Sequence, residues 1–235
     1  LEKVKKTMPK AVNLTGIRKI SANKLTSIWQ NVTMVTLTVE VDVSKIIELC
    51  NRLNSISESR SNQINMTDVL IKIMGMALVE HPKANVSLID GMLIEHQDIN
   101  ISVAVALDEG LIVPVIKRVD QKGLLEINGE KRRLIEKAKN GSLNKDELTG
   151  GCMTISNIGM LGADIFTPIL NSPESHILGL GRVNKKPVVV EDEIVIRPMM
   201  WLSHTFDHRA LDGVPAMKLL ASIRDMIEEP YKIIL

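Results

Sequence analysis

The chain has 235 residues, of which 45% are hydrophobic and 24% charged, a composition typical of a globular protein with its own core. Its 29 lysines and arginines against 28 aspartates and glutamates leave a formal net charge of +1, which argues against a nucleic-acid or anionic-membrane partner. No apolar run approaches the roughly 18 residues of a membrane span, and no signal-peptide core follows the N-terminus.

The first elements can be read from hydrophobic periodicity. Residues 1–16 have mixed charge and are expected to form an N-terminal arm. Alternation over residues 33–43 predicts a half-buried strand. We expect Ser44 to cap the helix that follows, and Thr67 to cap a second helix that ends before Pro82, with a polar loop between them.

The second half of the chain mixes strands and helices. Residues 86–95 predict a hairpin that turns at Asp90-Gly91, and Asp108-Glu109-Gly110 separates two further short strands. A helix is expected over about 124–139, and apolar spacing predicts a last helix after Gly213. The remaining predicted strands are 152–156, 177–182, 188–190 and 194–203.

This order of elements predicts the fold class. Strands do not alternate strictly with helices, and no Gly-x-Gly-x-x-Gly or P-loop pattern is present. We therefore expect an α/β sandwich in which a mixed β-sheet packs against helices, with residues 17–235 forming a single domain. Cys50 and Cys152 lie among apolar neighbours and match no zinc or redox spacing, so both are expected to be reduced core residues of a protein in a reducing compartment.

His208 is the first candidate for chemistry. It lies in the run Asp207-His208-Arg209-Ala210-Leu211-Asp212-Gly213, between a predicted strand and the last helix. Imidazole both accepts and returns a proton near neutral pH. Asp212 can orient the ring, and Gly213 permits a sharp turn. The same string also occurs around ordinary, satisfied histidines.

Ser156 is the second candidate. The predicted strand at 152–156 delivers Ser156 and Asn157 into a loop that contains Gly159 and Gly162. This arrangement can present a hydroxyl to a developing oxyanion. Taken alone, the segment is better explained by a serine that is satisfied in a strand-end turn.

Several segments in order resemble one family. They are LTGIRKI at 14–20, DEGLIVPVI at 108–116, LTGGCMTISNIG at 148–159, FTPILN at 166–171 and ILGLGR at 177–182. Together with the run at His208, they resemble the catalytic domain of the dihydrolipoamide acyltransferases, the acyl-transfer subunits of 2-oxo-acid dehydrogenase complexes. The pattern is more distantly similar to chloramphenicol acetyltransferase.

The resemblance implies a fold and a mechanism. The fold would be chloramphenicol-acetyltransferase-like, and the domain would form trimers with each active site in a channel between subunits. His208 would be the general base that deprotonates the thiol of coenzyme A or dihydrolipoamide, and Ser156 would donate to the tetrahedral oxyanion. Asp212 would support the site, with Arg18 as the candidate partner for an ion pair.

The resemblance also implies substrates and partners. Coenzyme A would be one substrate, and the other would be lipoamide carried on a lipoyl domain, which we do not find in this chain; that domain would be either removed or borrowed. Trimers would assemble into a larger hollow core with the decarboxylase and dihydrolipoamide dehydrogenase components, in the cytoplasm of a bacterium or archaeon or in a mitochondrial matrix. The acyl group could be acetyl, succinyl, branched-chain or another.

The alternatives come from departures and from the histidines. Residues 31–34 differ from the family's usual pattern before its first long strand, and the resemblance gives His204 no role. His204, Asp207, His208 and Asp212 could instead form a metal site, since imidazole and carboxylate suit zinc or manganese. The remaining alternatives are a coenzyme A-dependent acyltransferase with a different acceptor and a scaffold whose chemistry has lapsed.

Overall fold

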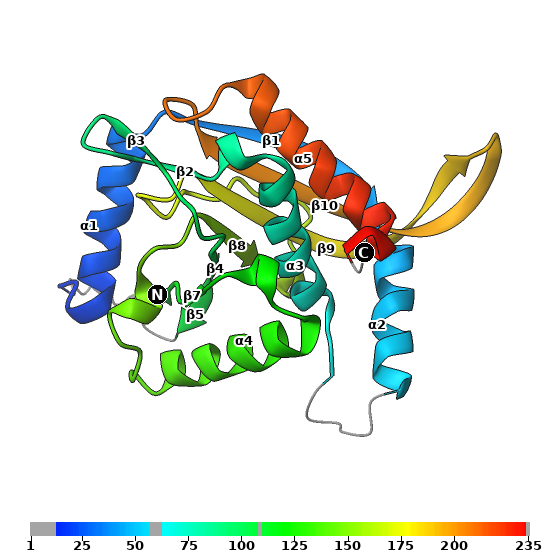
Figure 1. The fold of residues 1–235 in the computed structure, drawn as a ribbon, viewed down its shortest axis with the longest axis horizontal. Helices are drawn as coiled ribbons and strands as arrows, with labels where there is room; N and C mark the ends of the chain where they lie inside the picture. Colours follow the sequence, from blue (N-terminus) through cyan, green and yellow to red (C-terminus); the bar gives the residue numbers. More distant parts are fainter. Residues whose placement is uncertain (1–12, 57–62, 108–109, 234–235) are drawn as a thin grey trace, which may run out of the picture.

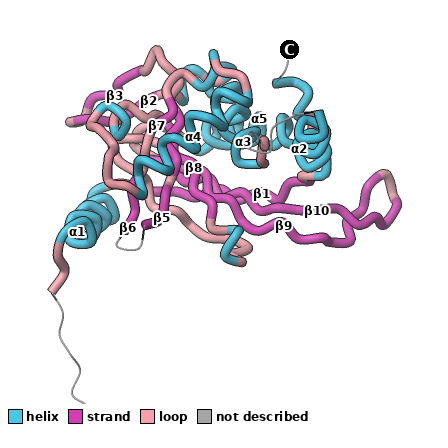
Figure 2. The backbone as a smooth tube through the Cα atoms, turned by 90° about the horizontal axis from the view of Figure 1, so that it is seen from below, coloured by secondary structure: helices cyan, strands magenta, loops and turns pink. Residues whose placement is uncertain are grey.

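The computed structural model describes residues 13–56, 63–107 and 110–233. A six-stranded mixed sheet forms the centre, and α3 (Met66–Glu80) and α5 (Gly213–Glu228) lie across one of its faces (Figures 1 and 2). α2 (Ser44–Ile56) and α4 (Leu124–Lys139) lie on the same side, whereas α1 (Gly16–Asn31) lies apart from them, beside β6 (Gly110–Ile112). The predicted α/β sandwich of a mixed sheet with helices is confirmed.

The strand order in the sheet is β1-β10-β9-β8-β4-β7, with β8 parallel to both of its neighbours. These strands are β1 (Met34–Asp42), β4 (Ile101–Val103), β7 (Val115–Ile116), β8 (Met153–Asn157), β9 (His176–Val190) and β10 (Glu193–Asp207). Two small hairpins complete the structure, formed by β2 (Val86–Ile89) with β3 (Met92–Glu95) and by β5 (Val105–Leu107) with β6. Within the described residues, no helix has the length and hydropathy required to cross a bilayer.

The two faces of the sheet differ in chemistry. Residues directly opposite one another on paired strands share a face, so the register assigns each side chain to a side. The side covered by α3 and α5 is largely apolar and includes Val35, Leu37, Ile101, Val103, Met153, Ile155, Leu178, Leu202 and Phe206. The other side carries mostly hydroxyls and glycine: Thr36, Thr38, Ser102, Thr154, Ser156, Gly179, Ser203 and Thr205. The hydrophobic core therefore lies on one side, and Ser156 lies on the other.

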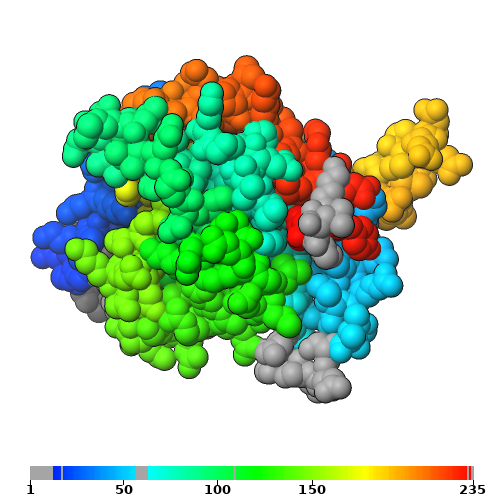
Figure 3. Space-filling view, viewed as in Figure 1, coloured from blue at the N-terminus to red at the C-terminus, as the bar shows by residue number. Residues whose placement is uncertain are grey.

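The β9–β10 hairpin extends beyond the rest of the sheet. Both strands have 15 residues, but β8 accompanies β9 only as far as Leu180. The outer part is a two-stranded ribbon that projects from the body of the molecule (Figure 3). We predicted two strands, 177–182 and 188–190, where the structure has the single strand β9. Pro187 causes no break because only β10 pairs with β9 at that level.

Most predicted elements are confirmed. The strand at 33–43, the helix at 124–139, the last helix and the hairpin at 86–95 are present, and Asp90 and Gly91 both have positive φ at its turn. The predicted turn at residues 108–110 lies partly outside the described residues, as do residues 1–12 of the predicted arm.

Both predicted helix caps are wrong. At α2, the Asp42 carboxylate accepts from the N–H and the hydroxyl of Ser44. At α3, Asn65 is the cap and forms a reciprocal capping box with Asp68. In both cases a longer carboxylate or amide side chain before the predicted residue takes the first free N–H groups.

The two cysteines are buried and free, as predicted. Burial, the largest cause in each case, raises the pKa of Cys50 and the pKa of Cys152 to about 11. Both thiols are therefore protonated near neutral pH and are poor nucleophiles. They belong to the structure of the core.

Candidate active site

His208 directly follows the last residue of β10 and precedes α5 by a short turn, as the sequence predicted. Its backbone N–H donates to Thr33 O at 2.8 Å, so the turn is tied to the segment before β1. Its side chain is 40% exposed, and the ring lies against that of Phe206 with centroids 5.6 Å apart. The imidazole is therefore supported on one side and accessible on the other.

The side chains around His208 have distinct partners. Asp212 Oδ1 lies 3.9 Å from His208 Nδ1, and the Asp212 side chain is 86% exposed. Asp207 is buried and accepts from the Arg209 guanidinium, which also donates to Asn31 O at 2.7 Å. The Asp207–Arg209 pair fixes the turn, whereas Asp212 remains open to a partner.

Ser156 is on β8, next to last in the strand, on the hydroxyl-bearing side of the sheet. Asn157 ends the strand, and its side chain accepts from the N–H of Gly159 at 3.1 Å, which closes the turn that the glycines predicted. A cavity of about 340 Å³ lies beside Ser156. Its lining includes Lys24 and Ile28 of α1, and it is otherwise largely apolar.

Glu174, a buried carboxylate beside this cavity, was not predicted from the sequence. Glu174 is 5% exposed, and it accepts from Ser102 at 2.6 Å, from Thr154 and from Asn171 at 2.9 Å. Burial raises the pKa of Glu174, although the three hydrogen bonds oppose this shift. Lys24 donates to Asn171 at 2.8 Å and so links the network to α1. The only signal in the sequence is a glutamate two residues before a strand whose first part is buried.

Within one chain, Ser156 and His208 are far apart. Ser156 pairs with Gly179, and Gly179 pairs with Ser203, so Ser156 is level with Ser203 two strands away. His208 lies five residues beyond Ser203. At about 3.3 Å per residue and about 4.8 Å per strand, the two are separated by roughly 20 Å. At this separation, the two side chains of one chain cannot contact the same thioester group.

Two other predicted contacts are not formed within the chain. Arg18 is exposed in the first turn of α1, and among the described residues no ion pair joins it to Asp212. The alternative of a metal site is wrong because its four side chains do not converge. His204 is wholly buried and contacts His176, Asp207 is bound by Arg209, and no group of three or more potential ligands occurs in the part of the chain that the structure describes.

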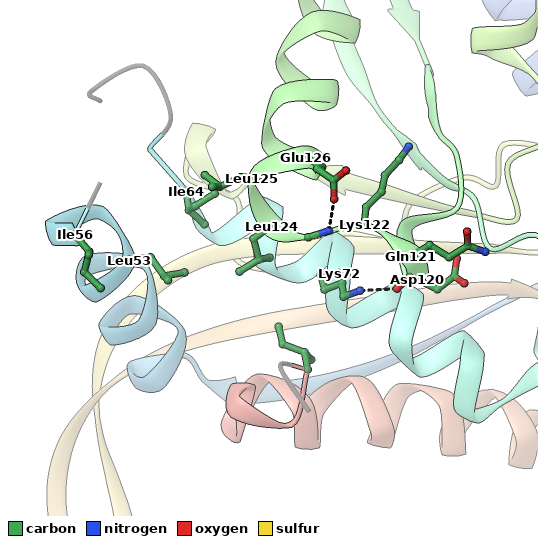
Figure 4. Close-up of a pocket in the computed structure, with 12 residues that line it drawn as sticks. Leu53, Ile56, Ile64, Lys72, Asp120, Gln121, Lys122, Leu124, Leu125 and Glu126 are labelled. Carbon is green, nitrogen blue, oxygen red and sulfur yellow. Dashed lines mark hydrogen bonds between the residues drawn. The ribbon is translucent and has the colours of Figure 1, made fainter. Parts of the chain in front are cut away.

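A larger cavity of about 910 Å³ lies elsewhere, between α2, α3, the start of α4 and Ile233 (Figure 4). Six of its twelve lining residues are leucine or isoleucine. Lys72 at its wall donates to Asp120 O at 2.7 Å, and burial lowers the pKa of Lys72. None of the sequence-predicted site residues lines this cavity, so its size does not make it the candidate active site.

The structure thus presents two candidate groups, an exposed histidine directly after β10 and a serine beside a cavity, which do not meet within one chain. The family described as 2-oxoacid dehydrogenases acyltransferase (catalytic domain) matches residues 6–235. The chain belongs to this family, and the predicted resemblance is confirmed.

Curated relatives agree. The chain is 38% identical over 216 residues to the dihydrolipoyllysine-residue acetyltransferase component of the pyruvate dehydrogenase complex of Rickettsia felis, covering 92% of this chain and 52% of that protein. It is 34% identical to the succinyltransferase component of the 2-oxoglutarate dehydrogenase complex of Pseudomonas aeruginosa, covering 96% of this chain and 56% of that protein. The chain thus spans about half the length of these relatives.

Solved structures place the fold. The dihydrolipoamide acetyltransferase of Azotobacter vinelandii matches with a TM-score of 0.93 and 32% identity, over 100% of this chain and 98% of that chain. A chloramphenicol acetyltransferase matches with a TM-score of 0.54 and 12% identity, over 91% of this chain and 96% of that chain. The second likeness concerns the fold alone, and it agrees with the predicted chloramphenicol-acetyltransferase-like class.

Proposed function

We propose that this chain transfers an acyl group between coenzyme A and the thiol of dihydrolipoamide carried on a lipoyl domain. His208 is the general base. It removes the proton from the attacking thiol, because a free thiol has a pKa of about 8.5 and only its thiolate attacks well. The imidazolium then returns the proton to the departing sulfur.

Ser156 acts on the intermediate. As the thiolate adds to the thioester carbonyl, the C–S bond forms and the carbonyl oxygen becomes an oxyanion. The Ser156 hydroxyl donates to this oxygen, and collapse of the intermediate breaks the original C–S bond. The largely apolar cavity beside Ser156 excludes water from the thioester.

One observation carries this assignment. In the Azotobacter vinelandii enzyme, a serine, a histidine and an asparagine were investigated for their role in the catalytic mechanism, at intervals of 52 and 4 residues. Ser156, His208 and Asp212 stand at the same intervals in this chain. Here an aspartate takes the place of the asparagine.

The active site would be completed by a second subunit of a homotrimer. The distance of roughly 20 Å between Ser156 and His208 in one chain, estimated from strand geometry, supports a site shared between chains. Large apolar side chains are also exposed on α1 and in the turn that follows β8: Trp29 at 66%, Met160 at 87% and Leu161 at 86%. Such surfaces are typical of protein interfaces.

The proposal extends to the complex and to the acyl group. One similar solved structure is the cubic core of a pyruvate dehydrogenase multienzyme complex, which supports assembly of trimers into a hollow core served by decarboxylase and dihydrolipoamide dehydrogenase components. The relatives of this chain include acetyl- and succinyltransferases. The proposed acyl group is acetyl, because several similar relatives are acetyltransferase components.

The test is an acyl-transfer assay with free dihydrolipoamide as acceptor. Acetyl-, succinyl- and branched-chain acyl-coenzyme A are compared at equal concentrations. His208→Ala should abolish transfer while the assembly stays intact by sedimentation. Ser156→Ala should lower kcat by on the order of a hundredfold, the scale of a lost oxyanion donor. A near-normal rate in His208→Ala refutes the base assignment, and an effect of Ser156→Ala on KM alone refutes the oxyanion role.

A further inference from the structure

Two histidines interrupt the apolar side of the sheet. His176 on β9 and His204 on β10 are both 0% exposed. His176 Nδ1 lies 3.1 Å from His204 Nε2, and the rings are stacked with centroids 5.2 Å apart. On its other side, His176 Nε2 lies 2.9 Å from Ala84 O, in the short helix η2 (Pro82–Ala84) that follows α3. The pair therefore links the two central strands to a neighbouring segment.

The hydrogen bonds fix the tautomers of this pair. Ala84 O can only accept, so His176 Nε2 carries a hydrogen. Burial lowers the pKa of His176 to about 4 and the pKa of His204 well below its usual value, so both rings are neutral near pH 7. His176 Nδ1 is then an acceptor, and His204 Nε2–H donates to it. The His204 ring is held in one orientation by this bond.

A row of rings leads from this pair to the catalytic histidine. The ring centroids of His204 and Phe206 are 5.7 Å apart, and those of Phe206 and His208 are 5.6 Å apart. Alternate residues of a strand lie on one side, so His204 and Phe206 follow one another along β10, and His208 continues the row just beyond its end. Phe206 is wholly buried between the two histidines.

His208 has little other support. Its Nδ1 is 3.9 Å from Asp212, which exceeds hydrogen-bonding distance. Among the interactions of the described residues, no hydrogen bond to its ring is formed, and the imidazole lies against the Phe206 ring. On its other side, the Phe206 ring lies against the ring of His204.

We propose that His204 is a positioning residue for the acyl transfer: its ring packs against the ring of Phe206 and sets its orientation, and Phe206 in turn sets the ring of His208. This inference rests on the proposed role of His208. His204 would then have a role in the reaction, whereas the family resemblance assigns it none. A residue that only filled the core could be an aliphatic side chain of similar volume.

Two substitutions of His204 distinguish the effect of its aromatic ring from the effect of its volume. His204→Phe keeps an aromatic face against Phe206, whereas His204→Leu removes it, and both remove the hydrogen bond to His176. We expect both variants to lose thermal stability. His204→Leu should lower kcat by on the order of tenfold to a hundredfold, the range of a small misplacement of a catalytic group. KM should change less than about twofold, and His204→Phe should restore most of the lost kcat.

A double-mutant cycle tests the path through Phe206. If His204 acts through Phe206, the losses in kcat of His204→Leu and Phe206→Leu are not additive, and the double variant is little slower than Phe206→Leu alone. Phe206→Met serves in the same cycle if Phe206→Leu does not assemble. Leu202→Val is the matched control, because Leu202 is equally buried on the same side of β10 but lies away from His208. It should lower stability without changing kcat.

The outcomes are distinct. If His204→Leu keeps kcat within about twofold of the native protein, or if His204→Phe and His204→Leu are equally slow, the positioning role is overturned. Additive losses in the cycle overturn the path through Phe206. A failure of the proposed function itself appears elsewhere, as an active His208→Ala variant.

Discussion

Asp212 Oδ1 lies 3.9 Å from His208 Nδ1, at the start of α5 and on an exposed side chain. At this distance and exposure, the carboxylate orients the imidazole weakly within one chain. The Azotobacter vinelandii enzyme has an uncharged asparagine at the corresponding interval. What both side chains share is an oxygen that accepts a hydrogen bond.

We therefore expect Asp212→Asn to keep kcat within about threefold, whereas Asp212→Ala should lower kcat by roughly tenfold, the lower end of the effect of a misoriented catalytic group. Steady-state acyl transfer at saturating substrates measures both. Equal losses in the two variants would mean that the negative charge, rather than the accepting oxygen, is what the site uses.

Mixed assemblies should recover activity. A protomer with His208→Ala retains Ser156, and a protomer with Ser156→Ala retains His208, so a site between one of each can be complete. For random mixing in equal amounts, about a quarter of the sites combine both native residues. Co-expression of the two inactive variants should thus give about a quarter of the native rate, whereas mixing the purified assemblies without exchange should give almost none. Equal, negligible rates in both experiments would place the two residues in one site of one chain.

The buried histidine pair should make stability depend on pH. In the unfolded chain the His176 imidazole takes up a proton near its usual pKa of 6.5, but in the folded protein burial lowers that pKa to about 4. The unfolded state therefore binds more protons as the pH falls from 6.5 to 4, and the free energy of unfolding decreases across this window. For His176 alone the decrease is about 3 kcal/mol, and it is absent above pH 6.5.

Thermal unfolding at pH 7.5 and pH 4.5 measures this effect. His176→Leu should be less stable at pH 7.5 but should lose less in Tm on acidification than the native protein. His81→Asn, at the partly exposed end of α3, is the control and should retain the native pH dependence. An undiminished loss in His176→Leu would show that other groups dominate acid unfolding.

Gly181 has no room for a side chain. A Cβ at Gly181 would lie 1.9 Å from Asp164 O, in the backbone of the segment that follows the turn after Ser156. Gly181→Ala should force this segment to shift and lower the free energy of unfolding by about 1–3 kcal/mol or more. Kinetics should show a parallel loss, because the displaced segment borders the Ser156 turn.

The comparison is Gly129→Ala, in the middle of α4, where a Cβ meets nothing within 4 Å. Alanine there should raise the free energy of unfolding by about 0.5–1 kcal/mol, because it favours a helix more than glycine. Chemical denaturation of both variants decides the matter. A stable Gly181→Ala protein would imply that the 159–164 segment adapts freely.

The sequence predicted elements well where apolar residues face the core of the same chain. It predicted α4, the last helix and the strand at residues 33–43 for this reason. It did not predict α1, because Ile20, Leu25 and Trp29 are exposed within the chain and form no stripe toward its core. Hydrophobic periodicity predicts an element only when its apolar face packs against the core of the same chain.

The candidate site shows the same limit. His208 and its turn could be located because all their determinants lie within a few consecutive residues. Glu174 and His176 could not be assigned partners, because strand pairing brings Ser102 to Glu174 and His204 to His176 from distant parts of the sequence. The sequence alone also allows His204 to be a metal ligand. Its position on the buried side of β10 becomes known only with the strand register.

The offset of Ser156 and His208 along the sheet has a consequence for how this protein would behave on dilution. With the proposed site shared between subunits, an isolated protomer would hold both groups yet have no complete active site, so specific activity would fall as the protein is diluted, although every chain remained folded. Below the dissociation constant of the assembly, the rate would decline more steeply than the amount of polypeptide. The rate would then depend on the association equilibrium between identical chains. Newly synthesised chains would be inactive until they assembled.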